Sequence, residues 1–197
     1  MSTLVNNLFI LPNEIKINII SYISYTPLTK KELKDAVVLW CKNEKSKIEA
    51  NKKYGHISLW NTENITDMSY LFSNLQFNED ISKWNVSNVT NMNRMFRSTK
   101  SFNQPLNDWD VSNVTNMAHM FYMEVGKYKV PSVFNQPLDN WDVSNVVNMS
   151  YMFFGAKKFN QSLNNWDVSN VINMERMFTL NGMFACSMEQ LPIWYTN

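Results

Sequence analysis

Apolar residues recur between residues 60 and 178 at fixed distances from a tryptophan. After each tryptophan, Val or Ile stands at the fifth position, Met at the eighth and Phe at the twelfth. Successive tryptophans are 24, 25, 32 and 25 residues apart. A period of this length predicts stacked repeat units, each too small to bury its apolar face alone. The residues that we assign to the repeat core are Trp60, Trp84, Trp109, Trp141 and Trp166, together with Phe72, Phe96, Phe121, Phe153 and Phe178.

Each repeat also carries signals for local structure. An Asp or Asn precedes every Met of the phrase, and these residues are typical of helix N-caps. The next apolar positions follow three and four residues later, which is the spacing of one helical face. The segment before each tryptophan, such as residues 106–109, is the better strand candidate. We therefore predict one short strand and about one and a half helical turns in each coil.

The repeat phrase resembles a known family. NVTNMxxMF followed by FNQPLNxWDVSNV is similar to the BspA-type leucine-rich-repeat region of mycoplasma and other bacterial surface proteins, which also occurs in large-virus and protist proteins. The resemblance covers roughly residues 29–184. It implies an α/β fold, a leucine-rich-repeat-like right-handed solenoid of about five 25-residue coils with an α-helical N-terminal cap. It also implies a role in adhesion or protein binding, and no catalytic residues.

The chain before the repeats is predicted to be helical. Residues 1–53 form an N-terminal cap, residues 54–184 the repeats and residues 185–197 a C-terminal cap. Apolar residues within 11–23 recur at helical spacing, and residues 29–32 read as a capping box that starts a second helix. The apolar face of this second helix comprises Leu33, Ala36, Val37, Trp40 and Cys41.

A second interpretation of the N-terminal part remains open. LPNEIKINIISYI resembles the first helix of an F-box, within an F-box-like segment that would span residues 9–41. An F-box would make the protein a substrate adaptor of a ubiquitin ligase, with the repeats selecting the substrate. Against this interpretation, the later helix is already explained as the helical lead-in of the repeats.

The C-terminal end departs from the repeat. Leu191 stands where the next tryptophan is expected. Because terminal units of a stack must end it, we expect Trp194 and Tyr195 to fold back over the last coil. The alternative is an adhesive end that forms dimers.

One irregularity lies within the repeats. Seven extra residues follow Phe121, before the fourth tryptophan. Insertions of this kind map to loops, often on a binding face, although a neutral expansion of the loop explains them equally well. The residues of this candidate partner-binding loop are Tyr122, Lys127, Tyr128 and Lys129.

Composition excludes several classes of protein. The net charge of +1 is too low for the strongly basic surface typical of a general nucleic-acid binder. No apolar run approaches the roughly 20 residues of a membrane helix. The first residues show no signal peptide, so we expect an intracellular protein, with a surface location left open. Cys41 and Cys186 form no ligand cluster. The aligned Asp110, Asp142 and Asp167 suit turn capping better than calcium binding, so no metal or cofactor is expected.

These observations favour a non-enzymatic scaffold that presents a binding surface to another protein. We expect a monomer with a protein partner, and neither a nucleic acid nor a membrane as ligand. The alternatives are the F-box-type adaptor and a surface adhesin like the bacterial proteins that the repeats resemble.

Overall fold

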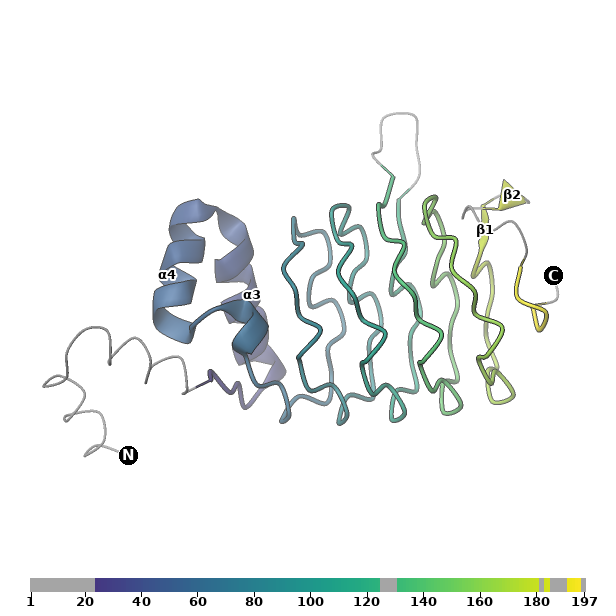
Figure 1. Cartoon of the computed structure of the whole chain (residues 1–197), viewed down its shortest axis with the longest axis horizontal. Helices are drawn as coiled ribbons and strands as arrows, with labels where there is room; N and C mark the ends of the chain where they lie inside the picture. Colours follow the sequence, from purple (N-terminus) through teal and green to yellow (C-terminus); the bar gives the residue numbers. More distant parts are fainter. Residues whose placement is uncertain (1–23, 125–130, 181–182, 185–190, 196–197) are drawn as a thin grey trace, which may run out of the picture.

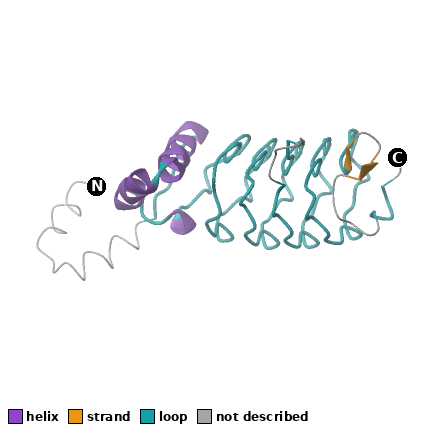
Figure 2. Cartoon of the chain, turned by 90° about the horizontal axis from the view of Figure 1, so that it is seen from above, coloured by secondary structure: helices purple, strands orange, loops and turns teal. Residues whose placement is uncertain are grey.

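The computed structural model describes residues 24–124, 131–180, 183–184 and 191–195. Two helices, α3 (Lys30–Lys42) and α4 (Glu44–Tyr54), precede a 3-10 turn, η1 (Ile57–Leu59). The repeats follow as a row of coils lying one beside the next (Figure 1), and the view from above shows the same row (Figure 2). The strands β1 (Thr179–Leu180) and β2 (Met183–Phe184) come after the fifth copy of the repeat. The helix predicted within residues 11–23 lies outside the described residues.

The predicted strand–helix solenoid is wrong. Between residues 60 and 178, the described chain contains neither a helix nor a strand. The strand-like pairing between successive described copies is limited to single-residue parallel bridges, and β1 and β2 pair antiparallel with each other rather than along the row. The molecule is therefore no leucine-rich-repeat-like α/β solenoid but a row of irregular coils. The bridges join Asp67 to Asn91, Asn91 to Asn116, Asn116 to Asn148 and Asn148 to Asn173.

The backbone shows why no helix forms after these Asp and Asn residues. Asn91 Oδ1 accepts a hydrogen bond from the N–H two residues later, at 3.0 Å, which is a turn rather than a helix cap. The third residue after each Asp or Asn then has a positive φ, between 50° and 60°. A right-handed helix requires a negative φ, so propagation stops there. These left-handed residues are Tyr70, Arg94, His119, Tyr151 and Arg176.

Backbone hydrogen bonds between coils replace the missing helix. Met68 N–H donates to Asn91 O at 2.9 Å, and Phe72 N–H donates to Met95 O at 2.8 Å. Between these two donors, Leu71 N–H closes a turn by donating to Met68 O at 3.2 Å. The same alternation recurs in the second, third and fourth copies. The backbone groups are thus paired without a regular strand, as buried peptide groups require.

The core consists of side chains from equivalent positions lying against each other. All five tryptophans and five phenylalanines that the sequence assigns to the core are at most 3% exposed. Phe72 and Phe96 stack at 5.3 Å between ring centroids with planes 3° apart, and each later phenylalanine repeats this arrangement at 5.5–5.7 Å. The indole N–H groups also find acceptors, because Trp84 Nε1 donates to Ile57 O and Trp141 Nε1 to Leu106 O, both at 2.8 Å. Such ring stacks stabilise beyond the burial of area alone.

The helix α3 closes the first coil. Thr29 is its N-cap and accepts from Glu32 N–H at 3.2 Å, which places the predicted helix start correctly. Four residues of the predicted apolar face are buried, whereas Cys41 is only partly buried. On the polar side, Lys34 Nζ donates to the carbonyl oxygens of Tyr70 and Leu71 at 2.7 Å each. At Leu71 the ammonium group thus replaces the donor that an earlier coil supplies to the equivalent Met95 carbonyl oxygen.

The last coil is covered by the chain end. The Trp194 ring stacks on Trp166 at 6.4 Å with planes 7° apart, and its Nε1 donates to Leu163 O at 2.9 Å. These are the contacts that tryptophans make within the repeats. Tyr195 meets Phe178 edge to face at 5.1 Å. Trp194 therefore takes the place of a sixth repeat tryptophan, although the sequence puts Leu191 at the expected spacing.

Candidate binding face

One residue from every coil contributes to a row of aromatic and cationic side chains. The row consists of the left-handed residues, which stand ten positions after each tryptophan. Because the inter-coil hydrogen bonds fix the spacing of the backbone, side chains of neighbouring coils lie close together, and they contact each other at three of the four steps along the row. Arg94 Nη1 donates to Tyr70 Oη at 2.5 Å, and its guanidinium lies 5.3 Å from the centre of the Tyr70 ring. Further along, His119 and Tyr151 stack at 4.9 Å, and the Arg176 guanidinium lies 6.0 Å from the Tyr151 ring.

A second, shorter row runs beside the first. The Arg97 guanidinium lies 5.3 Å from the Tyr122 ring, which stacks on Phe154 at 5.1 Å with planes 5° apart. The two rows touch where His119 approaches Tyr122 at 5.4 Å and Tyr151 approaches Phe154 at 5.6 Å. We call the two rows together the ladder face. It comprises Tyr70, Arg94, Arg97, His119, Tyr122, Tyr151, Phe154 and Arg176.

Exposure along the ladder face differs from one end to the other. Tyr70 is 46% exposed and Arg176 is exposed, whereas the residues between them are half-buried and Phe154 is buried. Stacked rings and guanidinium groups held in this way have already lost much of their rotamer freedom. Their contact with another molecule therefore costs less conformational entropy than that of mobile side chains. Tyr and Arg are also the residue types that dominate binding energy at protein interfaces.

His119 is the titratable group at the centre of the ladder face. Burial, together with the nearby charges of Arg94 and Arg97, lowers the pKa of His119 to about 4. The imidazole is therefore neutral at pH 7. Its buried Nδ1 has no hydrogen-bond partner within the described residues. Its neighbour Tyr151 donates to Glu175 Oε1 at 2.8 Å, and this hydrogen bond raises the pKa of the Tyr151 hydroxyl.

The sequence located only part of this face. Tyr122, from the candidate partner-binding loop, lies in the shorter row, whereas Lys127, Tyr128 and Lys129 lie outside the described residues. The rest of the face was missed. A signal was present, because the tenth position after the tryptophan is aromatic or cationic in all five copies. No local pattern shows that these residues share one face, since that depends on how the coils stack.

The carboxylates and the cysteine have structural roles. Asp110 and Asp142 each accept from the N–H and the hydroxyl of the serine two residues on, and these bonds lower the pKa of Asp142. Burial raises the pKa of the Cys41 thiol to about 11, so it is a poor nucleophile. In the part of the chain that the structure describes, no three His, Cys, Asp or Glu side chains gather as metal ligands. None of the described helices has the length and apolar character needed to cross a membrane.

Comparison with known proteins adds one finding. The family described as "Mycoplasma protein of unknown function, DUF285" matches residues 42–128 and 125–194, which include all five copies of the repeat. The chain belongs to this family. The family is related in general to BspA-like repeat proteins, but no named relative supports the leucine-rich-repeat or F-box resemblance. No curated protein and no solved structure matches the chain.

Proposed function

We propose that the protein is a non-enzymatic module that binds another protein through the ladder face. The observation that carries this proposal is the pair of rows, in which every coil supplies an aromatic or cationic side chain. Inter-coil hydrogen bonds hold the rows at fixed spacing. A rigid surface rich in Tyr and Arg is well suited to anchoring a protein partner.

The guanidinium groups indicate what the partner must offer. Arg97 is paired with Glu124 at 2.8 Å. Arg94 forms no ion pair within the described chain and donates instead to Tyr70 Oη and Asn93 Oδ1. Because a guanidinium has five N–H donors, Arg94 retains donors for a carboxylate or carbonyl oxygen of a partner. We therefore propose a partner surface that places an acceptor group over Arg94 and apolar or aromatic groups over Tyr151.

The adaptor and adhesin roles stay predictions from sequence. The residues of the F-box-like helix lie outside the described chain, and α3 buries its apolar face in the core. This packing gives the adaptor role no additional support. Recovery of ubiquitin-ligase subunits with the protein, in amounts that do not depend on the ladder face, would favour the adaptor over our proposal.

Quantitative co-purification from native cells tests the proposal. The double variant Arg94→Ala/Tyr151→Ala is compared with Lys83→Ala/Lys158→Ala, which removes two exposed lysines that lie outside the ladder face. We expect the first variant to lose a bound protein by about tenfold or more, since two anchors are removed. The control should retain that protein.

Folding must be separated from binding in this comparison. Melting temperatures are therefore measured for every variant, and Tyr70→Ala is added because its side chain is 46% exposed and its removal should disturb the core little. Equal recovery of every bound protein by the parent and by folded ladder-face variants would contradict the proposal.

A further inference from the structure

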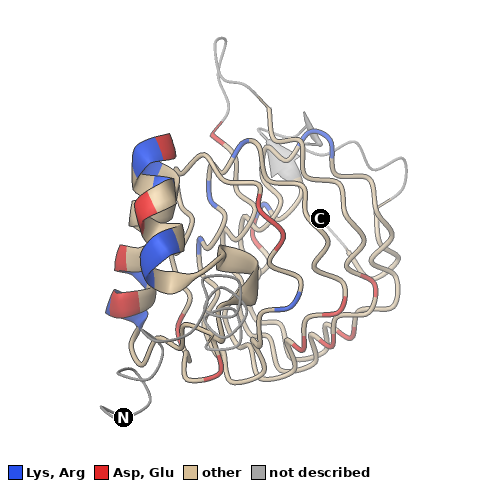
Figure 3. Ribbon diagram, turned by 60° about the vertical axis from the view of Figure 1, so that its left-hand side comes forward, with Lys and Arg blue, Asp and Glu red and all other residues tan. Residues whose placement is uncertain are grey.

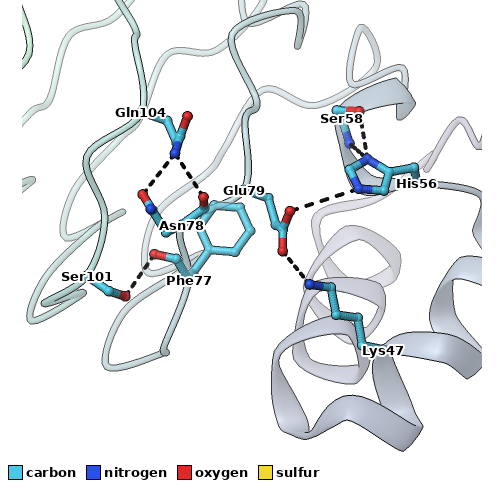
Figure 4. A network of polar contacts seen from close by, with 8 residues as sticks. All are labelled: Lys47, His56, Ser58, Phe77, Asn78, Glu79, Ser101 and Gln104. Atoms are coloured by element: carbon cyan, nitrogen blue, oxygen red, sulfur yellow. Dashed lines mark hydrogen bonds and ion pairs between the residues drawn. The ribbon is translucent and has the colours of Figure 1, made fainter.

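A ladder of asparagines joins the FNQ phrases of successive coils. Asn103 N–H donates to Asn78 Oδ1 at 2.8 Å, Asn135 N–H to Asn103 Oδ1 at 2.9 Å and Asn160 N–H to Asn135 Oδ1 at 2.8 Å. The following glutamine strengthens each rung, as Gln104 Nε2 does by donating to Asn78 O at 3.0 Å (Figure 4). Every rung thus uses an Asn side chain of the preceding coil as its acceptor.

The first rung of this ladder is open. Asn78 has no preceding coil, and its N–H has no acceptor within the described residues. Because the equivalent N–H groups all donate toward the preceding coil, that of Asn78 faces the helices. Glu79 stands where later coils have glutamine. Its side chain contacts the helical cap, whereas those glutamines contact the preceding coil. Its carboxylate lies 2.5 Å from Lys47 Nζ and 3.9 Å from His56 Nε2 (Figure 4).

A cleft lies at this open rung, between the helices and the first coil. It has a volume of about 300 Å³, and its lining includes Trp40, Phe77 and Asn78. Trp40 is 3% exposed, and its indole N–H has no hydrogen-bond partner in the described chain, whereas the repeat tryptophans donate to carbonyl oxygens. The cleft therefore brings together two residues that each have a backbone or side-chain donor without an acceptor. Asn78 is an exposed residue, whereas the Trp40 donor is buried, and a buried donor is costly unless a ligand supplies its acceptor.

The charges of the cleft restrict the acceptor. Glu44 and Glu79 line it, and Lys47 is already bound to Glu79. A carboxylate ligand would face two like charges with one cation already paired, so a neutral amide oxygen suits the site better. The later rungs use that same group, an Asn side chain. The volume is at the lower end for ligand sites and fits a few residues of extended chain.

We propose that this cleft binds an extended peptide segment of a partner protein, whose Asn side chain supplies the acceptor for Asn78 N–H. The bound segment takes the place of a coil before the first one. This site shares no residue with the ladder face. It can therefore fail while the ladder-face proposal holds, and the reverse is also true.

The test uses the full chain and a synthetic peptide with the sequence of residues 101–107, SFNQPLN, which contains the Asn of a natural rung. Two matched peptides carry Asn103→Leu and Asn103→Asp. In ¹⁵N-labelled protein, we expect the backbone amide of Asn78 and the indole N–H of Trp40 to shift together and to saturate. The parent peptide should bind about tenfold more tightly than either matched peptide.

Two protein variants sharpen the test. Gln76→Trp adds bulk at an exposed residue that lines the cleft and should abolish binding without lowering the melting temperature, whereas Lys83→Trp is the matched control outside the cleft. Glu44→Gln removes one negative charge that repels the Asp peptide. The difference in affinity between the Asn and the Asp peptide should therefore become smaller.

Several outcomes would overturn the proposal. These are the absence of saturable shifts, equal affinities for the three peptides, and binding that survives Gln76→Trp. Shifts of Asn78 and Trp40 caused by unlabelled protein alone would identify a second copy as the occupant and would also overturn it.

Discussion

Lys47 Nζ lies 2.5 Å from Glu79 Oε1, and this ion pair joins α4 to the first coil. Later coils have glutamine at the position of Glu79 and bind their neighbours through its amide. Asp67 is a parallel case, because later coils have Asn there and Asp67 pairs with Lys30 at 2.9 Å. The first coil thus replaces amides with carboxylates where it meets lysines of the helices. Cationic and acidic residues are interspersed along the helices (Figure 3).

Glu79→Gln should weaken the attachment of the helices to the coils. Lys47 and Glu79 are each about one-third exposed, so solvent screens the pair and we expect a loss of about 1 kcal/mol in the free energy of unfolding. Urea unfolding measures this loss, which should shrink as salt is added. Glu63→Gln is the matched control, because Glu63 is exposed and its carboxylate forms no ion pair in the described chain. Equal midpoints for both variants would show that the pair contributes nothing.

Trp109→Ala should cost about 3–5 kcal/mol in the free energy of unfolding, as expected for truncation of a buried aromatic side chain. Trp109 is 3% exposed, and its Nε1 donates to Ile81 O at 3.2 Å. Trp109→Phe keeps a ring but loses this hydrogen bond, so a smaller loss is expected. Chemical unfolding of the three proteins gives the comparison. A Trp109→Ala variant as stable as the parent would mean that this indole is not part of the core.

Trp194→Ala should expose the last coil. The side chain is only partly buried, so we expect a loss of about 2 kcal/mol, less than for Trp109→Ala. The effect should be local, with faster amide hydrogen exchange at Met177, whose N–H donates to Met174 O at 3.2 Å. Ile193→Ala is the control, since Ile193 is adjacent and 84% exposed. Unchanged exchange in the fifth coil would contradict the covering role of Trp194.

The stability of the protein should fall as the pH drops from about 6.5 toward 4. The folded state holds the pKa of His119 at about 4, below its ordinary value of 6.5, so the unfolded chain binds the proton first. The neutral imidazole therefore stabilises the fold above pH 6.5, and this contribution is lost through that window. Allowing for partial solvation, we expect at most about 2 kcal/mol.

His119→Gln isolates this effect from the carboxylates that titrate nearby. Urea midpoints of the parent and the variant are measured between pH 7 and pH 4. The difference between the two proteins should change with pH across this window. A constant difference would show that His119 titrates with an ordinary pKa in the folded protein.

The sequence predicted the buried positions better than the backbone that holds them. A fixed period places Trp and Phe of each copy at equivalent positions, and stacking then buries them whatever the local conformation. The helix prediction failed because Asn followed by apolar residues at spacings of three and four fits a turn as well as a helix. The deciding feature is a left-handed conformation at Tyr70 and Arg94, which non-glycine residues rarely adopt. Hydrogen bonds between coils offset the energetic cost of this left-handed conformation. Because these bonds join residues far apart in the sequence, no local sequence pattern indicates them.

The candidate site illustrates the same limit. Tyr122 could be singled out because it begins an insertion, whereas Arg94, His119 and Tyr151 lie in regular repeats and gave no local signal. The copies share an aromatic or cationic residue at the tenth position after the tryptophan, but each copy by itself gives no sign of a binding residue. Whether these residues form one surface depends on the contacts between neighbouring coils, such as the 4.9 Å stack of His119 on Tyr151.

Photo-crosslinking in native cells tests the binding role of the ladder face most directly. A benzophenone amino acid replaces Tyr151 in one protein and the exposed Lys158 in another. We expect light to attach a distinct partner protein at position 151 and not at position 158, with both proteins folded to the same melting temperature. Adducts that form equally at both positions, or only at position 158, would contradict a partner seated on the ladder face.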